Sequence, residues 1–267
     1  MDGQSSYQLL AEKARVAAEA TNRRIDVLDL ACGDGYLIQE CLHRLGERIN
    51  TITGVDMSHD ELAAGHSRLR THEVRLYECL AQDLALPDES IDVALCHLAF
   101  MLMLPIEPVV QELARVLRPS GIFSAVLVST SAPAATEGHE LAAPRALWTH
   151  AAAALREFWQ TEYPRMQMEG RVGDARAMTE SGWSKLFRPE LGYARYIEAR
   201  EFDIVIEEDT PDGIWDFFEK SYSVALLDDE MKDQLRQRLI DVIVPHRDAH
   251  GTFEMAVPHR MFTVRKR

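Results

Sequence analysis

The chain has 267 residues, 46% of them hydrophobic, which is enough for one large packed domain or for one domain with a substantial insertion. Its 43 acidic residues outnumber its 29 lysines and arginines, giving a formal net charge of −14. That balance argues against a broad nucleic-acid-binding surface, because binding to phosphates depends largely on lysine and arginine contacts.

Helices and strands are expected to alternate through the first half of the chain. Helical spacing of apolar residues predicts helices over residues 6–23, 35–45, 59–70 and 109–121, the last one stopped by Pro119 and Gly121. Short apolar runs predict buried strands over residues 25–30, 51–58, 74–80, 91–98 and 122–130. This order indicates a doubly wound α/β fold, in which helices cover both faces of a mostly parallel sheet.

The alternation ends after Thr130. The composition of residues 131–144 is typical of a loop, and helices are expected over residues 145–159, 178–193, 210–222 and 228–244. Strands are expected over residues 199–208 and 259–267. We interpret residues 1–130 as an N-terminal helix plus a ligand-binding core. Residues 131–267 are interpreted as helical substrate insertions plus the last two strands of the same sheet, within a single domain.

The cysteines and the apolar runs indicate in which cellular compartment the protein is expected. The cysteines, at positions 32, 41, 79 and 96, form no CxxC pair and match neither a zinc site nor a disulfide scaffold. The first ten residues lack the pattern of a signal peptide, and the longest apolar run, residues 93–106, is too short to span a membrane. A cytoplasmic protein with no metal and no membrane partner is therefore expected.

The stretch "VLDLACGDGYL", residues 27–37, places Gly33 and Gly35 between an expected strand and an expected helix. In a doubly wound sheet, ligands bind at the carboxyl ends of the strands, where this turn is expected to lie. A nicotinamide site requires a small residue at the third position of its glycine motif, where this chain has Tyr36 or Ile38. No G-K-[ST] sequence follows, so a Walker loop is excluded as well. The turn suits a ligand without phosphates.

This stretch resembles the first motif of the class I (Rossmann-like) S-adenosylmethionine-dependent methyltransferases. The matching pattern is Asp29-x-Ala31-x-Gly33-x-Gly35, in which an alanine replaces the first glycine of the family. Together with "GVDMS", "AQDLALPDESIDVALCHLAFML" and "ELARVLRPSGIF", the resemblance covers roughly residues 25–127. It implies a seven-stranded sheet with an antiparallel last strand, S-adenosylmethionine as the cofactor and S-adenosylhomocysteine as the product.

The resemblance also implies which residues hold the cofactor. Asp56, at the end of the second strand, would bind the ribose hydroxyls, Asp83 the adenine amino group, and Leu84 would donate a backbone contact. Asp29 is expected to orient the glycine turn through backbone N–H groups. The other residues assigned to the cofactor are Ala31, Cys32, Gly33, Asp34, Gly35, Met57, Gln82 and His97. Tyr7 and Tyr36 are candidates for the cofactor's carboxylate or methionine arm.

His97 is the candidate catalytic residue. It ends the fourth expected strand, where an acceptor would meet the cofactor, and histidine can deprotonate a phenol or a protonated amine near neutral pH. The alternative is a packing residue or a hydrogen-bonded pocket histidine. His150 and His246 are further candidates.

The acceptor is expected to bind to the region after Thr130, which holds all four tryptophans of the chain. Trp148, Trp183, Trp215 and Tyr222 are the candidate substrate-binding residues, and core packing is the alternative for each of them. Residues 201–233 contain twelve acids and two lysines, which would repel nucleic acid and favours a small organic acceptor.

The leading hypothesis is therefore a methyltransferase that acts on oxygen or nitrogen of a small molecule, in specialised metabolism. One alternative is a methyltransferase of tRNA or protein. Others are a non-catalytic S-adenosylmethionine-binding regulatory protein, a non-methyl reaction that uses the cofactor's charge, and a nicotinamide oxidoreductase. The sequence leaves open the acceptor, the methylated atom and the oligomeric state.

Overall fold

The computed structural model describes residues 5–129, 141–161, 173–225 and 227–267, with the backbone alone at Thr161, Tyr222 and Ser223. The chain divides into two compact units. Unit 1 comprises Met1–Val128, Gly173–Glu201 and Arg260–Arg267, and unit 2 comprises Ser129–Val172 and Phe202–His259. The expected loop over residues 131–144 lies mostly outside the described residues.

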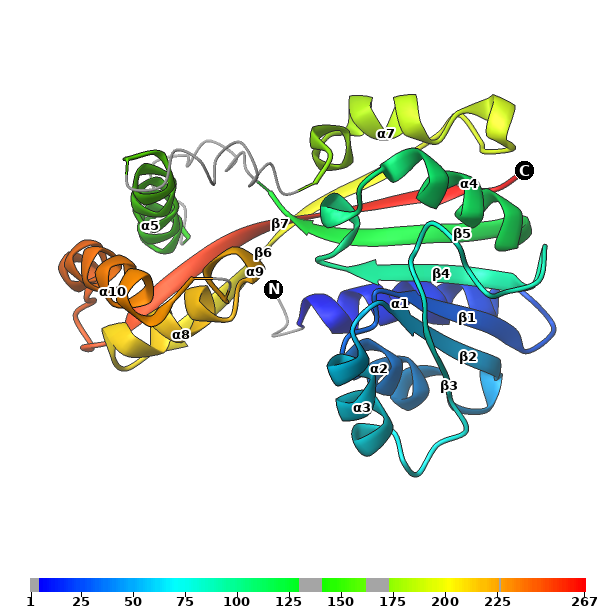
Figure 1. Cartoon of the computed structure of the whole chain (residues 1–267), viewed down its shortest axis with the longest axis horizontal. Helices are drawn as coiled ribbons and strands as arrows, with labels where there is room; N and C mark the ends of the chain where they lie inside the picture. Colours follow the sequence, from blue (N-terminus) through cyan, green and yellow to red (C-terminus); the bar gives the residue numbers. More distant parts are fainter. Residues whose placement is uncertain (1–4, 130–140, 162–172, 226) are drawn as a thin grey trace. The chain divides into compact units, whose positions relative to one another are not determined.

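Seven strands form one sheet in the order β3-β2-β1-β4-β5-β7-β6 (Figure 1). Their bounds are β1 (Ile25–Leu30), β2 (Ile49–Asp56), β3 (Arg75–Glu78), β4 (Ile91–His97), β5 (Leu117–Val128), β6 (Glu198–Glu208) and β7 (Phe253–Arg265). The pairs β1–β2, β1–β4, β2–β3 and β4–β5 are parallel. The predicted doubly wound, mostly parallel sheet is confirmed.

The last strand, β7, runs antiparallel to β5. Near one end of the pair, the Ser120 N–H donates to the Lys266 carbonyl (3.1 Å), and near the other, the Ser129 N–H donates to the Pro258 carbonyl (2.8 Å). The partner's residue number falls as that of β5 rises, which is the antiparallel register. The implied antiparallel last strand is confirmed, although β7 begins six residues before the expected strand.

The α-helices number nine in the described part of the chain. They are α1 (Ser6–Glu19), α2 (Tyr36–Leu45), α3 (His59–Arg68), α4 (Ile106–Val116), α5 (Ala142–Thr161), α7 (Glu180–Leu186), α8 (Pro211–Glu219), α9 (Tyr222–Ala225) and α10 (Asp229–Ile243). Short 3-10 turns are η1 (Gly46–Arg48), η2 (Phe100–Leu102), η3 (Ala175–Met178), η4 (Pro189–Leu191) and η5 (Val244–His246). None of the described helices is long and apolar enough to cross a membrane.

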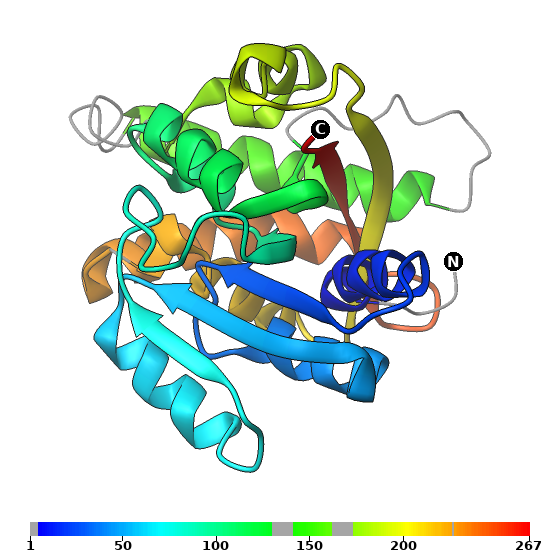
Figure 2. The same ribbon diagram turned by 90° about the vertical axis from the view of Figure 1, so that its right-hand side faces the viewer.

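Within unit 1, helices cover both faces of the sheet. α1 packs against α2 and β4, and α4 packs against β5 on the other side from α1 (Figure 2). A capping box at Ser5 and Gln8 fixes the start of α1: each residue's side chain accepts a hydrogen bond from the other's backbone N–H. All six residues of β1 are buried, as the apolar run predicts for a central parallel strand.

Two predicted helix boundaries were wrong. The helix expected over residues 109–121 ends at Val116, because Leu117 is already extended (φ −69°, ψ 135°) and residues 117–121 begin β5. The helix expected over residues 178–193 is broken into η3, α7 and η4. Gly192, with φ of 90°, ends the last of these turns in the left-handed region.

The core of unit 1 contains an aromatic cluster, and Trp183 lies inside it. Its ring is fully buried and stacks on Phe123 (centroids 5.6 Å apart) and on Phe187 (4.7 Å). The indole N–H donates to the Ala177 carbonyl (2.6 Å). The prediction that Trp183 binds substrate is wrong, because helical spacing of aromatics fits a core position equally well and the ring offers no surface to a ligand.

Unit 2 has its own packing. The Trp148 ring of α5 stacks on Phe218 of α8, with the centroids 6.1 Å apart. Arg145 pairs with the buried carboxylate of Asp203 (2.6 Å), an ion pair that joins α5 to β6. These contacts give α5, α8 and β6 a common core.

Candidate active site

The turn between β1 and α2 contains three residues with positive φ: Ala31 (57°), Gly33 (51°) and Gly35 (78°). The Cys32 N–H donates to the Val55 carbonyl (3.0 Å), which ties the turn to the end of β2. A Cβ added to Gly33 would meet only Glu61 Oε2, at an ordinary contact distance of 3.5 Å, so this glycine is not crowded by its neighbours. The turn therefore presents bare backbone that a ligand can approach closely.

Asp56 connects this turn to β2. Its Oδ2 accepts the Gly33 N–H (2.8 Å), and its Oδ1 accepts the Ser58 N–H (2.9 Å). The carboxylate is thereby fixed at the carboxyl ends of two adjacent strands. The structure thus brings together the glycine turn and the acid that the sequence predicted for the ribose.

Asp29 does not orient the turn, contrary to the expectation from the sequence. Its side chain is fully buried, and neither oxygen accepts a hydrogen bond from any described residue. Burial, and then the charge of Asp56, raise the pKa of Asp29 to about 8. A buried carboxyl without donors favours its neutral form, unless a cation comes close to it.

Asp34 is held by Arg68, a residue that the sequence analysis did not consider. The guanidinium of Arg68 pairs with the Asp34 carboxylate and donates to its carbonyl (3.1 Å). It also lies over the Tyr36 ring, 5.4 Å from the centroid. The ring of Tyr7 meets that of Tyr36 edge-on at 4.7 Å. The two tyrosines therefore lie together beside the glycine turn.

On the other side of the turn, the loop after β3 is held by Glu112. This carboxylate of α4 accepts the Leu84 N–H (2.8 Å), and the Leu84 side chain is buried. The Leu84 backbone therefore does not offer the expected contact to a base. Sequence analysis could not identify Glu112, because 28 residues separate the two positions.

The other candidates in this loop have different surroundings. Asp83 is exposed. Burial, with the charges of Asp83 and Asp56, raises the pKa of the Cys79 thiol. Gln82 donates to the Leu104 carbonyl (3.0 Å). Met57 is 73% exposed, which leaves an apolar side chain available next to Asp56.

His97 ends β4 and lies under the start of α1. Its Nε2 is 2.8 Å from the Ser6 hydroxyl, and the Tyr7 ring stacks on the imidazole with centroids 3.6 Å apart. Burial, followed by the charges of Asp34 and Asp29, raises the pKa of the Tyr7 hydroxyl. Ser6 was missed by the sequence analysis, since a serine in the first turn of a helix carries no signal for a contact 91 residues away.

The charges of this site favour a cationic ligand. The Asp56 carboxylate lies beside the turn, Arg68 compensates the charge of Asp34, and the buried Asp29 can become an anion when a cation comes close. Such a site would repel a pyrophosphate and attract a sulfonium. The bare turn and the unpartnered Asp29 carboxyl therefore fit S-adenosylmethionine better than a nicotinamide dinucleotide.

Comparisons with known proteins agree. Residues 28–125 match the family described as methyltransferase domain. A probable S-adenosylmethionine-dependent methyltransferase of Mycobacterium tuberculosis is 36% identical over 119 residues, which are 43% of this chain and 38% of that protein. The first half of the chain therefore contains a region that matches a methyltransferase domain, and the similar protein of Mycobacterium tuberculosis is named as S-adenosylmethionine-dependent.

Two further similarities extend this result. The phosphatidylethanolamine N-methyltransferase of Cereibacter sphaeroides is 29% identical over 41% of this chain and 53% of its own length. The YcgJ protein of Bacillus subtilis has the same fold, with a TM-score of 0.58 at 18% identity over 94% of this chain and 97% of its own. The chain thus covers from about a third to about half of the two curated relatives.

The remaining acceptor candidates from the sequence lie in unit 2. Trp215 is 5% exposed in α8, whereas Trp148 is only partly buried in α5. Tyr222 belongs to α9, and its side chain lies outside the described residues. His150 Nδ1 and His246 Nε2 are 2.9 Å apart, so these two histidines pair with each other.

Proposed function

We propose that this chain transfers the methyl group of S-adenosylmethionine to an oxygen or nitrogen atom of a small organic acceptor, in specialised metabolism. The observation that carries the proposal is the position of His97: it ends β4, adjacent to β1 and its glycine turn, and contacts Ser6 and Tyr7. We also place the protein in the cytoplasm, where its four free cysteine thiols would stay reduced.

When bound, S-adenosylmethionine supplies a methyl group that is already electrophilic. The protein therefore has to bind the cofactor and the acceptor, align them and exclude water from the site. Asp56 would bind the ribose hydroxyls, while the backbone at Gly33 and Gly35 lies against the amino-acid part. Asp29 would place a carboxyl close to the positive charge of the ligand. Asp83 remains the candidate for the adenine amino group, and Met57 would cover a face of the base.

The proposed role of His97 is to take the proton of the acceptor. A phenol or a protonated amine is a poor nucleophile until it loses its proton, and imidazole accepts protons near neutral pH. The Ser6 hydroxyl, 2.8 Å from Nε2, would set the tautomer of the ring. Tyr7 stacks on the imidazole and would fix the orientation of its plane.

Charge supports a small acceptor over a nucleic acid. The chain has a net charge of −14, and the Asp56 carboxylate lies beside the glycine turn. The similar protein of Cereibacter sphaeroides is named for methylation of an amine, which supports nitrogen as the acceptor atom. Trp148 is partly exposed in unit 2, so it stays an aromatic candidate for an acceptor contact.

Calorimetric titrations with S-adenosylmethionine, S-adenosylhomocysteine and a nicotinamide dinucleotide test the cofactor. We expect binding of the first two and none of the third. Transfer of a labelled methyl group to a panel of phenols and amines then tests the reaction, with RNA and a basic protein as further acceptors. Methylation of RNA or protein alone would overturn the small-molecule proposal.

A non-catalytic S-adenosylmethionine-binding protein is the second candidate. The Tyr7 ring covers one face of His97, with centroids 3.6 Å apart, and this contact favours a histidine that packs instead of reacting. Cofactor binding without methylation of any acceptor in the panel would favour this candidate. Methylation that is lost in His97→Ala at unchanged cofactor affinity would exclude it.

A further inference from the structure

One face of α3 lies along the glycine turn of unit 1. A Cβ built on Gly33 would meet Glu61 Oε2 at 3.5 Å, and a Cβ built on Gly65 would meet the carbonyl of Asp34 at 3.5 Å. Glu61 and Gly65 are four residues apart on α3, so both belong to the same face of this helix. The Glu61 carboxylate therefore reaches the turn at Gly33, where the backbone carries no side chain.

The start of α3 fixes the backbone of Glu61 relative to this glycine. Ser58 is the N-cap of the helix, and its hydroxyl accepts the Glu61 N–H (3.3 Å). The Ser58 N–H donates to Asp56 Oδ1, and Asp56 Oδ2 accepts the Gly33 N–H. Hydrogen bonds thus connect Glu61 to Gly33 through Ser58 and Asp56. The carboxylates of Asp56 and Glu61 both lie at this glycine.

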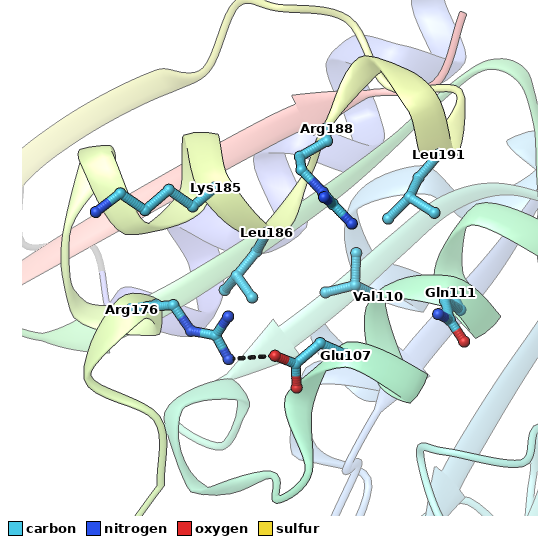
Figure 3. Close-up of a pocket in the computed structure, with 8 residues that line it drawn as sticks. All are labelled: Glu107, Val110, Gln111, Arg176, Lys185, Leu186, Arg188 and Leu191. Atoms are coloured by element: carbon cyan, nitrogen blue, oxygen red, sulfur yellow. Dashed lines mark hydrogen bonds and ion pairs between the residues drawn. The ribbon is translucent and has the colours of Figure 1, made fainter.

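The Glu61 carboxylate is uncompensated, whereas two other carboxylates of unit 1 are paired with arginines. Asp34, in the same turn, pairs with Arg68. Glu107, which lines a pocket between α4 and α7, pairs with Arg176 at 2.6 Å (Figure 3). The side chain of Glu61 is exposed and makes no hydrogen bond or ion pair with any residue that the structure describes. It is therefore an acceptor that a cationic group of a ligand can use.

S-adenosylmethionine has a cationic group at each of two places, the sulfonium and the ammonium of its amino-acid part. The proposed function places the amino-acid part against the backbone at Gly33 and assigns the ribose hydroxyls to Asp56. A group that approaches Gly33 meets the Glu61 carboxylate, and an ammonium has N–H donors for such an acceptor. A nucleoside without the amino-acid part would leave Glu61 without a partner.

We propose that Glu61 is a specificity-determining residue of the cofactor site, whose carboxylate binds the ammonium of the amino-acid part. Glu61 thereby favours S-adenosylmethionine and S-adenosylhomocysteine over adenine nucleosides that lack this part. This role rests on the proposed function, because it requires that the glycine turn binds the cofactor. Glu61 takes no part in the transfer of the methyl group, since the ammonium is not a reacting group.

Calorimetric titration of the full chain with three ligands tests this role. S-adenosylhomocysteine carries the ammonium without the sulfonium, S-adenosylmethionine carries both, and methylthioadenosine carries neither. Glu61→Gln retains the size of the side chain and removes its charge. It should weaken the binding of the first two ligands equally, by about two- to fivefold, as expected for one exposed ion pair. The affinity for methylthioadenosine should stay the same.

The matched control is Asp60→Asn. Asp60 is the other acid in the first turn of α3 and is also exposed, so both variants remove one negative charge from the same end of the helix. The Cβ position of Gly33 has no atom of Asp60 within 4 Å. Both variants should therefore lower the melting temperature by a similar amount, and only Glu61→Gln should weaken the binding of S-adenosylhomocysteine.

Four results would overturn the role of Glu61. They are an unchanged affinity of Glu61→Gln for S-adenosylhomocysteine, an equal loss of affinity in Asp60→Asn, an equal loss for methylthioadenosine, and a larger loss for S-adenosylmethionine than for S-adenosylhomocysteine. The last result would mean that Glu61 responds to the sulfonium and not to the ammonium. A wild-type chain that binds none of the three ligands would instead contradict the proposed function itself.

Discussion

The Ser6 hydroxyl lies 2.8 Å from Nε2 of His97, and this contact joins the first turn of α1 to the end of β4. The capping box at Ser5 fixes where α1 begins and therefore where Ser6 stands. The hydroxyl can donate to the ring nitrogen or accept from it, and either arrangement selects one tautomer of the imidazole. Ser6 is in this view a positioning residue for His97.

Replacing these two residues separates the base from its positioning residue. His97→Ala should lower the methylation rate by about 100-fold or more, the range of general-base catalysis, with cofactor affinity nearly unchanged. Ser6→Ala should lower the rate about three- to tenfold, the effect of one lost hydrogen bond, and shift the pH profile. The double variant should be no slower than His97→Ala. Rates and cofactor affinities are measured on the same preparations.

Ser5→Ala is the control for this pair, because it removes the cap of α1 but leaves the Ser6 hydroxyl in place. It should lower the free energy of unfolding by about 1 kcal/mol without a shift of the pH profile. Ser6→Thr retains a hydroxyl and should restore most of the rate. A His97→Ala variant that keeps the wild-type rate would remove His97 from the proposed base role.

Asp56 and Asp83 should respond differently to removal of their charge. Asp56 accepts two backbone N–H groups, and an asparagine can accept only one of them through its oxygen. Asp56→Asn should therefore lower the free energy of unfolding by about 1–3 kcal/mol and also weaken the binding of S-adenosylmethionine. Asp83 is exposed, so Asp83→Asn should change stability by no more than about 0.5 kcal/mol.

Denaturant unfolding and calorimetric titration measure both effects. If Asp83 binds the adenine amino group, Asp83→Asn should weaken the binding of S-adenosylmethionine less than Asp83→Ala does. The reason is that a carboxamide oxygen can still accept that hydrogen bond. Unchanged cofactor affinity in Asp56→Asn would contradict the ribose assignment. An equal loss of stability in both asparagine variants would contradict the difference in their backbone contacts.

Gly35 is the residue of the turn that an alanine should disturb most. Its φ is 78°, and an added Cβ would lie 2.6 Å from Cδ1 of Leu69. Gly35→Ala should cost about 1–2 kcal/mol for the left-handed backbone, plus the displacement of Leu69. Gly192 has a similar backbone conformation, but its Cβ would meet nothing within 4 Å. Gly192→Ala is therefore the matched control.

The comparison of these two alanine variants by denaturant unfolding isolates the crowding at Leu69. Only Gly35→Ala should also weaken the binding of S-adenosylmethionine, since only Gly35 belongs to the glycine turn. Equal stability losses would mean that the Leu69 side chain moves aside without cost. Unchanged cofactor affinity in Gly35→Ala would show that the turn does not contact the ligand.

Sequence information was sufficient where the signal is local. The turn at residues 31–35 follows directly from small residues between a buried strand and a helix, and the structure gives Ala31, Gly33 and Gly35 positive φ. Long-range contacts were not predictable in this way. Glu112 on the Leu84 N–H and Ser6 on His97 depend on which helix packs over which strand end. A single sequence contains no local signal for such pairs.

The misassignment of Trp183 has a related cause. An aromatic residue at helical spacing has the same pattern whether its ring faces a ligand or the core. The difference is set by Phe123 and Phe187, which come from other parts of the sequence and enclose the ring. The prediction that Asp29 accepts hydrogen bonds from backbone N–H groups of the turn was also wrong. The motif places Asp29 beside the turn but does not show which N–H groups already donate to another side chain. Asp56 takes that of Gly33.

Asp29 should make stability depend on pH. Its pKa is raised from 3.8 to about 8 by burial and by Asp56, so the folded state binds the proton more tightly than the unfolded state. The contribution of this group to the free energy of unfolding is therefore full below about pH 4 and is lost as the pH rises through about 8. Asp29→Asn removes the titration and leaves a neutral group of similar size.

We therefore expect the melting temperature of Asp29→Asn, relative to wild type, to increase steadily between pH 5 and pH 8.5. Thermal melts without cofactor measure this difference, and Asp233→Asn, an exposed position on α10, is the control whose difference should stay constant. S-adenosylmethionine brings a positive charge to the site, so its presence should reduce the slope for Asp29→Asn. A pH-independent difference in the absence of cofactor would mean that Asp29 is already ionised in the folded protein and has a cationic partner.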